Sequence, residues 1–222
     1  MPLTSILEFT DTTVDPNIRG FLHVPETPNQ DGVILTHGAG GNAQAPLLRA
    51  LAETFVGAGF TMLRIDLPFR QMRPFGPPGP GDASRDRTGL KNAIVKMRTM
   101  LSGRIYLGGQ SYGGRQASML CAEQPDLAAG LLLLSYPLHP PRRPEQQRTQ
   151  HLPDLRTTAL FVSGTRDPFG TIAELERALK MIPAKTKLLP IEGAGHDLGF
   201  KEKASKEELP VRLLEEFQNF VR

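Results

Sequence analysis

Cysteine is nearly absent from this sequence of 222 residues, which contains Cys121 alone. A single cysteine excludes an intramolecular disulfide framework and a cysteine-based zinc site, and it is compatible with a reducing compartment. No stretch approaches the roughly 18 consecutive apolar residues of a membrane-spanning helix. Residues 1–11 lack a basic segment followed by an apolar one, so no secretory signal is predicted. A cytoplasmic location is therefore the default expectation.

A large excess of charge of one sign is also lacking, since 26 Lys and Arg residues against 23 Asp and Glu residues leave a net charge of +3. Neither nucleic acid nor a membrane is therefore an expected partner, and nothing indicates a protein partner. The chain is 39% hydrophobic and 22% charged, which is typical of a globular protein. One domain over residues 1–222 is the expected organisation.

Short apolar runs alternate with helical patterns along most of the chain. Residues 6–10 and 20–24 predict a β-hairpin. Six later runs have the continuous apolar character of strands buried on both faces: residues 32–36, 60–65, 104–108, 130–135, 158–163 and 186–191. Helices are predicted at residues 46–57, 85–101, 112–123, 171–181 and 206–221. This order predicts an α/β fold with a doubly wound, mostly parallel sheet of about eight strands, whose ligands lie beyond the carboxyl ends of the strands.

Proline is concentrated in two connections, residues 68–80 and 137–153, which each contain five of the 20 prolines. Neither connection has a clear helix or strand pattern. We expect both to lie over the binding edge of the sheet, although rigid surface loops fit equally well. About twenty residues separate the predicted strands 130–135 and 158–163. They are too few for a helical lid, so an open site is predicted.

The motif that points most directly to chemistry is Gly-Gln-Ser-Tyr-Gly at residues 109–113, which fits Gly-x-Ser-x-Gly between a predicted strand and helix. A nucleophile on so sharp a turn needs very small neighbours. Glycines supply them here, at residues 108, 109, 113 and 114. Ser111 is therefore the candidate nucleophile.

A second glycine-rich turn, Thr-His-Gly-Ala-Gly-Gly at residues 36–41, follows the first central strand, where a backbone N–H can face a developing oxyanion. Residues 38–43 also fit the G-x-G-x-x-A pattern of dinucleotide-binding proteins, with Asp66 where a ribose-binding acid would lie. The hydrolase interpretation is favoured, because dinucleotide binding leaves Ser111 and the later Asp and His residues unexplained.

Asp167 and His196 each follow a predicted strand near the end of the chain. A histidine that accepts the serine proton and an acid that fixes the histidine tautomer would activate Ser111. Asp197 and Glu192 are competing candidates for the acid, although Asp197 is adjacent to His196 in sequence and badly placed to orient it.

Together these motifs resemble the α/β-hydrolases, specifically the small dienelactone-hydrolase-like kind, over residues 34–198. Three strings are more narrowly similar to the branch named after a testis-expressed protein and a subunit of the nonspecific-lethal acetyltransferase complex; they are GQSYGGR at 109–115, SYPLHPP at 135–141 and GTRDPFG at 164–170. The resemblance implies an α/β-hydrolase fold without a lid domain, with Ser111 as nucleophile, Asp167 as acid and His196 as base. It also implies the N–H groups of Ala39 and Tyr112 as oxyanion donors.

Several arginines belong to loops predicted at the active edge: Arg70, Arg73, Arg142, Arg143 and Arg166. Solvated charge is one interpretation, and a basic rim that selects a carboxylate-bearing substrate is the other. His37 is a further candidate for substrate binding, although bracing of the oxyanion turn is favoured for it. No metal and no cofactor are predicted.

The function that these observations predict is a serine hydrolase of the esterase type, which cleaves small ester or thioester substrates through an acyl-enzyme. A binding or scaffold module with the same fold and no turnover is the alternative, and a dinucleotide-binding protein is a third, less favoured one.

Overall fold

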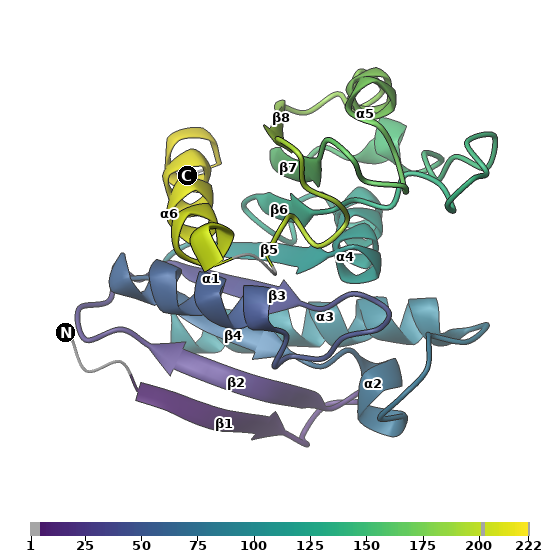
Figure 1. The fold of residues 1–222 in the computed structure, drawn as a ribbon. Helices are drawn as coiled ribbons and strands as arrows, with labels where there is room; N and C mark the ends of the chain where they lie inside the picture. Colours follow the sequence, from purple (N-terminus) through teal and green to yellow (C-terminus); the bar gives the residue numbers. More distant parts are fainter. Residues whose placement is uncertain (1–4, 201–202, 222) are drawn as a thin grey trace.

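The computed structural model describes residues 5–200 and 203–221, and these form one sheet of eight strands in the order β1-β2-β4-β3-β5-β6-β7-β8 (Figure 1). β1 pairs with β2, and β2 with β4, in antiparallel fashion, whereas the other neighbours are parallel. The strands are β1 (Ser5–Asp11), β2 (Ile18–Val24), β3 (Gly32–Thr36), β4 (Thr61–Ile65), β5 (Ile105–Gln110), β6 (Leu131–Leu134), β7 (Ala159–Gly164) and β8 (Thr186–Ile191). The predicted hairpin and mostly parallel sheet are confirmed.

Helices cover both faces of the sheet. They are α1 (Pro46–Gly57), α2 (Pro68–Met72), α3 (Asp82–Met100), α4 (Tyr112–Glu123), α5 (Ile172–Leu179) and α6 (Lys203–Phe220). α1 and α6 pack together over one face, and α3, α4 and α5 share the hydrophobic core on the other (Figure 1). Among the described residues, no helix is both long and apolar enough to cross a bilayer.

The apolar runs of the central strands supply side chains to both cores at once. In β6, Leu131 and Leu133 belong to the α3–α4–α5 core, whereas Leu132 and Leu134 belong to the α1–α6 core. Successive side chains of a strand point to opposite faces, so a strand covered on both sides must be apolar at every position. This double burial explains why these strands carry no polar alternation.

The two proline-rich connections contain short helical segments that were not predicted. α2 occupies Pro68–Met72 of the first connection, and a 3₁₀ turn occupies Leu152–Asp154 of the second. Each has a proline in its first turn, where the fixed φ favours helix entry and the missing N–H costs nothing. Segments this short contain too few residues to show a helical period.

A buried histidine on β2 forms a side-chain hydrogen bond with an arginine on β4. His23 is fully buried and its Nε2 accepts a hydrogen bond from Arg64 Nε at 2.9 Å. Burial and the neighbouring charges of Arg64 and Arg49 lower the pKa of His23 to about 4. The folded protein therefore holds His23 neutral, and a neutral imidazole has the ring-nitrogen lone pair that accepts from Arg64.

We expect the free energy of unfolding to fall as the pH is lowered from about 6.5 to about 4. In this window the unfolded His23 binds a proton that the folded form excludes, so stability decreases toward acid and is regained as the pH rises. Thermal melting of the wild type and His23→Gln over this range measures the effect. Within this pH range the wild type should bind up to one more proton on unfolding than the variant, so its free energy of unfolding should fall more steeply toward acid. Equal pH slopes for the two proteins would show that His23 is not the group responsible.

Candidate active site

Ser111 lies on the tight turn between β5 and α4, where its backbone has φ 50° and ψ −117°. Two glycines make this turn possible. A Cβ atom on Gly109 would lie 2.8 Å from the Gly113 carbonyl carbon, and one on Gly113 would lie 2.4 Å from the His37 carbonyl oxygen. Any larger residue would clash at either position, so the sequence permits the strained serine conformation that nucleophile turns require.

The structure brings Ser111, His196 and Asp167 together from three different loops. His196 Nε2 lies 2.9 Å from Ser111 Oγ, and His196 Nδ1 lies 2.8 Å and 3.0 Å from the two carboxylate oxygens of Asp167. The Asp167 side chain is 1% exposed, whereas that of His196 is 27% exposed. The three groups form a continuous hydrogen-bonded chain from a buried carboxylate to the hydroxyl of a half-buried serine.

Backbone contacts hold the loops after β7 and β8 against each other. Arg166 N–H donates to the Ala194 carbonyl at 2.9 Å, and a Cβ atom on Gly164 would lie 2.2 Å from that same oxygen. Glycine is therefore required at residue 164, because only then can the segment after β7, which carries Asp167, approach the segment after β8, which carries His196. Asp167 Oδ1 also accepts from Phe169 N–H at 2.9 Å, which leaves the carboxylate directed at His196.

Phe169 is part of this site although the sequence did not point to it. Its ring lies against the His196 imidazole, with 4.2 Å between ring centroids and 30° between planes. The stacked ring limits rotation of the imidazole and covers one of its faces. The available signal was an aromatic residue two positions after the candidate acid.

The two competing acids have other contacts. Asp197 Oδ1 accepts from Gly199 N–H at 3.1 Å, and exposed Glu192 accepts from Thr165 Oγ1 at 3.4 Å. Neither contact involves the His196 ring, whose Nδ1 is occupied by Asp167.

The glycine-rich turn after β3 passes directly beside the serine. A Cβ atom on Gly38 would lie 3.3 Å from Ser111 Cβ and 4.0 Å from its Oγ. Within residues 5–200 and 203–221, the N–H groups of Ala39 and Tyr112 have no acceptor in the protein, and Tyr112 is the first residue of α4. Both N–H groups are therefore available to a ligand atom, as the first N–H groups of a helix generally are.

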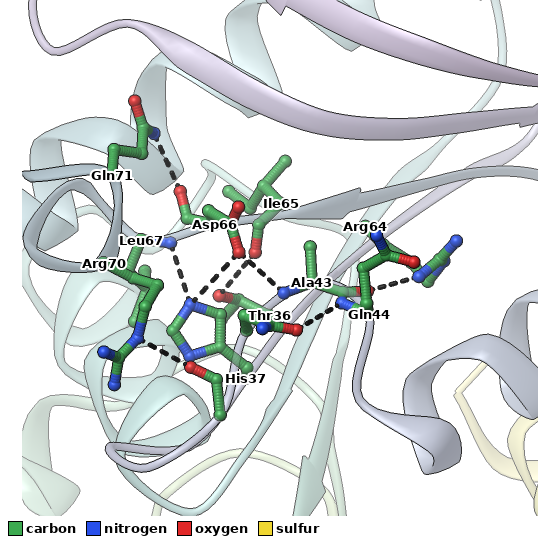
Figure 2. Close-up of polar contacts among 12 residues, drawn as sticks. Thr36, His37, Ala43, Gln44, Arg64, Ile65, Asp66, Leu67, Arg70 and Gln71 are labelled. Carbon is green, nitrogen blue, oxygen red and sulfur yellow. Dashed lines mark hydrogen bonds and ion pairs between the residues drawn. The ribbon is translucent and has the colours of Figure 1, made fainter. Parts of the chain in front are cut away.

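His37 orients one of these donors. Its Nδ1 donates to the Gly38 carbonyl at 2.8 Å. Figure 2 shows the second contact, in which Nε2 accepts from Leu67 N–H at 3.1 Å. Because C=O and N–H point in opposite directions across a trans peptide, fixing the Gly38 carbonyl toward His37 turns the Ala39 N–H the other way. His37 is fully buried, so it braces the turn and is not exposed to substrate. Burial lowers its pKa, which favours the neutral form that these two bonds require.

The contacts of Asp66 do not favour dinucleotide binding. Its Oδ1 accepts from Ala43 N–H at 2.7 Å and lies 3.8 Å from His37 Nε2, so the carboxylate stabilises the turn before α1 (Figure 2). In a dinucleotide-binding fold the helix begins at the glycines and its N-terminus faces the pyrophosphate. Here α1 begins at Pro46, eight residues after Gly38.

The prediction that Arg70 belongs to an exposed rim is wrong. Arg70 is 7% exposed, and its guanidinium donates to four backbone carbonyls at 2.7–3.1 Å. Two of them, Ala39 and Gly41, belong to the glycine-rich turn, and the others, Arg73 and Gly76, belong to the first proline-rich connection. The donors of Arg70 point inward and join these two loops, so the side chain does not contribute to an exposed rim.

We expect Arg70→Met and Arg70→Lys to lower kcat by about 10²-fold with little change in KM, since the turn that presents the Ala39 N–H loses its support. Lysine keeps the charge but lacks the planar fork that reaches several carbonyls. Steady-state kinetics on a short ester measures the effect. Arg85→Met, which removes an exposed ion pair with Asp15, is the matched control. An unchanged kcat in both Arg70 variants would show that the turn keeps its geometry without this arginine.

The other predicted rim arginines lie at the surface. Arg73 forms an ion pair with Asp82, whereas Arg142, Arg143 and Arg166 are exposed. Arg142 and Arg143 lie in the second proline-rich connection. This connection contacts the segment after β7, because His139 N–H donates to the Phe169 carbonyl at 3.0 Å. Within the described residues, the side chains of these four arginines form no hydrogen bond with Ser111, His196 or Asp167.

Comparison with known proteins agrees with this architecture. The chain is similar to a dienelactone hydrolase from Anabaena variabilis, with 23% identity, a TM-score of 0.77 and 99% of each chain covered. It is also similar to an alpha-beta serine hydrolase homologue from Coxiella burnetii, with 17% identity, a TM-score of 0.75 and 94% of this chain and 96% of that one covered. The esterase Pf2001 from Pyrococcus furiosus aligns at 16% identity and a TM-score of 0.74, with 99% of this chain and 94% of that one covered. A family model described as an alpha/beta hydrolase domain matches residues 29–221, so the chain belongs to the alpha/beta hydrolase family.

Proposed function

We propose that this protein is a serine hydrolase that cleaves small carboxylic esters or thioesters through an acyl-enzyme. The observation that carries the proposal is the hydrogen-bonded chain from Ser111 Oγ through His196 to the buried carboxylate of Asp167, with contacts of 2.9 Å and 2.8 Å. A serine hydroxyl is a weak nucleophile until a neighbouring base takes its proton. The similarity to a dienelactone hydrolase and to an esterase supports the same reaction class.

In the proposed mechanism, Ser111 Oγ attacks the substrate carbonyl carbon while His196 Nε2 takes the hydroxyl proton. Asp167 keeps the Nδ1 proton of His196 facing the carboxylate and stabilises the imidazolium that forms. The N–H groups of Ala39 and Tyr112 bind the developing oxyanion. His196 then returns the proton to the leaving oxygen or sulfur, and water, activated in the same way, cleaves the acyl-enzyme. The chain's own residues supply every step, so the proposal includes no cofactor.

The finer assignments belong to the same proposal. Residues 1–222 act as one hydrolase domain in the cytoplasm, and the strings at 109–115, 135–141 and 164–170 favour the branch of the testis-expressed protein and the nonspecific-lethal complex subunit. Arg73, Arg142 and Arg143 are the surface cations that we retain as candidates for contact with a substrate carboxylate.

The test is steady-state hydrolysis of p-nitrophenyl acetate and butyrate and of a short acyl thioester. We expect saturable turnover of at least one of them by the wild type, well above the rate with Ser111→Ala. Saturable binding without turnover would instead favour the scaffold alternative.

A further inference from the structure

A fully buried carboxylate lies between two helices that begin at the catalytic edge, and the mechanism above does not use it. This carboxylate belongs to Asp86 on α3, which packs against both α2 and α4. Asp86 has no solvent exposure, and within residues 5–200 and 203–221 it forms no ion pair. A buried carboxylate without a cation is costly unless hydrogen bonds satisfy it, so the contacts of Asp86 are informative.

The two oxygens of Asp86 each accept one hydrogen bond, and the two donors belong to different helices. Oδ1 accepts from Phe69 N–H in the first turn of α2 at 3.0 Å, and Oδ2 accepts from the Tyr112 hydroxyl at the start of α4 at 2.7 Å. Burial raises the pKa of Asp86, and these two bonds oppose that rise because they favour the charged form. Asp82 and Arg73, whose charges also act on Asp86, form an ion pair with each other.

The close approach of α3 to α2 depends on Gly89, which lies three residues after Asp86. A Cβ atom on Gly89 would lie 2.6 Å from Cγ of Pro68, the first residue of α2. Residues three apart lie on the same face of a helix, so the glycine and the carboxylate face α2 together. The glycine therefore allows the carboxylate to reach the Phe69 N–H, which has no acceptor inside its own helix.

Both donors to Asp86 adjoin the proposed oxyanion donors. Tyr112 carries one of these through its own backbone N–H. The ring of Phe69 packs against the Tyr112 ring and against the His37 ring, with 5.7 Å between centroids in each pair. His37 in turn braces the turn that presents the Ala39 N–H. One carboxylate therefore holds the side chains that lie next to both N–H groups.

We propose that Asp86 is a positioning residue, which acts through Phe69 and Tyr112 to hold the two oxyanion N–H groups in place while Ser111 reacts. The inference rests on the proposed function, and it concerns the oxyanion donors and not the activation of the serine. Donors that are preorganised toward a developing oxyanion stabilise the transition state more than the bound substrate. Loss of Asp86 should therefore lower kcat and leave KM nearly unchanged.

The experiment compares Asp86→Leu, Asp86→Asn and Tyr112→Phe with the wild type in steady-state hydrolysis of p-nitrophenyl acetate and butyrate. Leucine removes both acceptors, so kcat should fall by about 10²-fold with KM within about twofold. Asparagine keeps an acceptor for Phe69 N–H and offers its amide to the Tyr112 oxygen, so kcat should stay within about fivefold of the wild type. Tyr112→Phe loses only one of the two bonds, and its kcat should lie between those of the two Asp86 variants.

Two further readouts separate positioning from a general loss of structure. A short alkyl trifluoromethyl ketone adds to Ser111 Oγ and forms a tetrahedral oxyanion. Its inhibition constant should rise in Asp86→Leu by the same factor by which kcat/KM falls. The acidic limb of the pH profile of kcat/KM should not move, because the contact between His196 and Asp167 is unchanged.

Asp31→Leu is the matched control. Asp31 is a carboxylate with only 4% exposure, and it precedes β3 at the end of the sheet opposite the triad. This variant should lower the melting temperature and keep the wild-type kcat and inhibition constant. An equal loss of kcat in Asp31→Leu and Asp86→Leu would show that burial of a carboxylate, and not the position of Asp86, is what matters.

The remaining outcomes are also decisive. Wild-type kcat and ketone inhibition in Asp86→Leu overturn the inference and leave the proposed function standing. If Asp86→Leu does not fold, Tyr112→Phe decides, because it removes a single hydroxyl, and an unchanged kcat in that variant overturns the inference as well. If the wild type hydrolyses neither ester and does not bind the ketone, the proposed function fails first, and this inference fails with it.

Discussion

Replacing Ser111 by alanine is expected to lower ester hydrolysis by roughly 10⁴- to 10⁶-fold, because the proposed mechanism uses its Oγ to attack the carbonyl carbon. The residual rate would come from the oxyanion donors and substrate binding, which do not require the hydroxyl. Alanine also removes the 2.9 Å contact with His196 Nε2. Steady-state kinetics of the purified variant gives the size of the loss.

Two observations must accompany that loss. The melting temperature of Ser111→Ala should remain close to that of the wild type, since the substitution removes one half-exposed hydroxyl. Ser84→Ala, an exposed serine on α3, should keep full activity. A Ser111→Ala enzyme that retains more than about a tenth of the activity would mean that a different group performs the reaction.

Replacing Asp167 by asparagine is expected to lower kcat by about 10⁴-fold with the fold intact. Asparagine can still accept the hydrogen bond from Phe169 N–H through its side-chain oxygen. Its amide nitrogen, however, presents hydrogens where the carboxylate accepts from His196 Nδ1. The imidazole would then favour the tautomer with its proton on Nε2, which has no lone pair to take the proton of Ser111.

Glu192→Gln is the matched control for this carboxylate. Glu192 is an exposed acid on the same loop as His196, and its contact is with Thr165. We expect its removal to change kcat by less than about threefold. Comparable losses in the two variants would indicate a general effect of negative charge near His196 and not a specific orienting role for Asp167.

Much of the fold was predictable because its boundaries are set by local chemistry. The helix over residues 46–57 begins at a proline in its first turn, and the helix over residues 112–123 begins at the nucleophile turn, so both were predicted with the bounds that the structure has. The strand over residues 32–36 lies between polar and glycine-rich segments and was also predicted correctly. Residues 203–205 of α6 precede the predicted start at residue 206, although the prediction included Pro210 inside the helix as the structure does.

The interior roles of polar side chains were harder to predict. The four carbonyls that accept from Arg70 come from two separate loops, and only the folded chain brings them together. A sequence does not tell whether a loop arginine faces water or returns to the backbone. Bracing by His37 was expected because the residue precedes a glycine-rich turn, and the structure places its ring between that turn and Leu67.

The most direct test of the central claim is covalent labelling with a fluorophosphonate probe, followed by peptide mapping by mass spectrometry. The probe reacts with a serine that a neighbouring base has activated. We predict labelling of the wild type confined to Ser111, with none in Ser111→Ala and strongly slowed labelling in Asp167→Asn. Folded wild-type protein that remains unlabelled, or labelling at another serine, would contradict the assignment of Ser111 as an activated nucleophile.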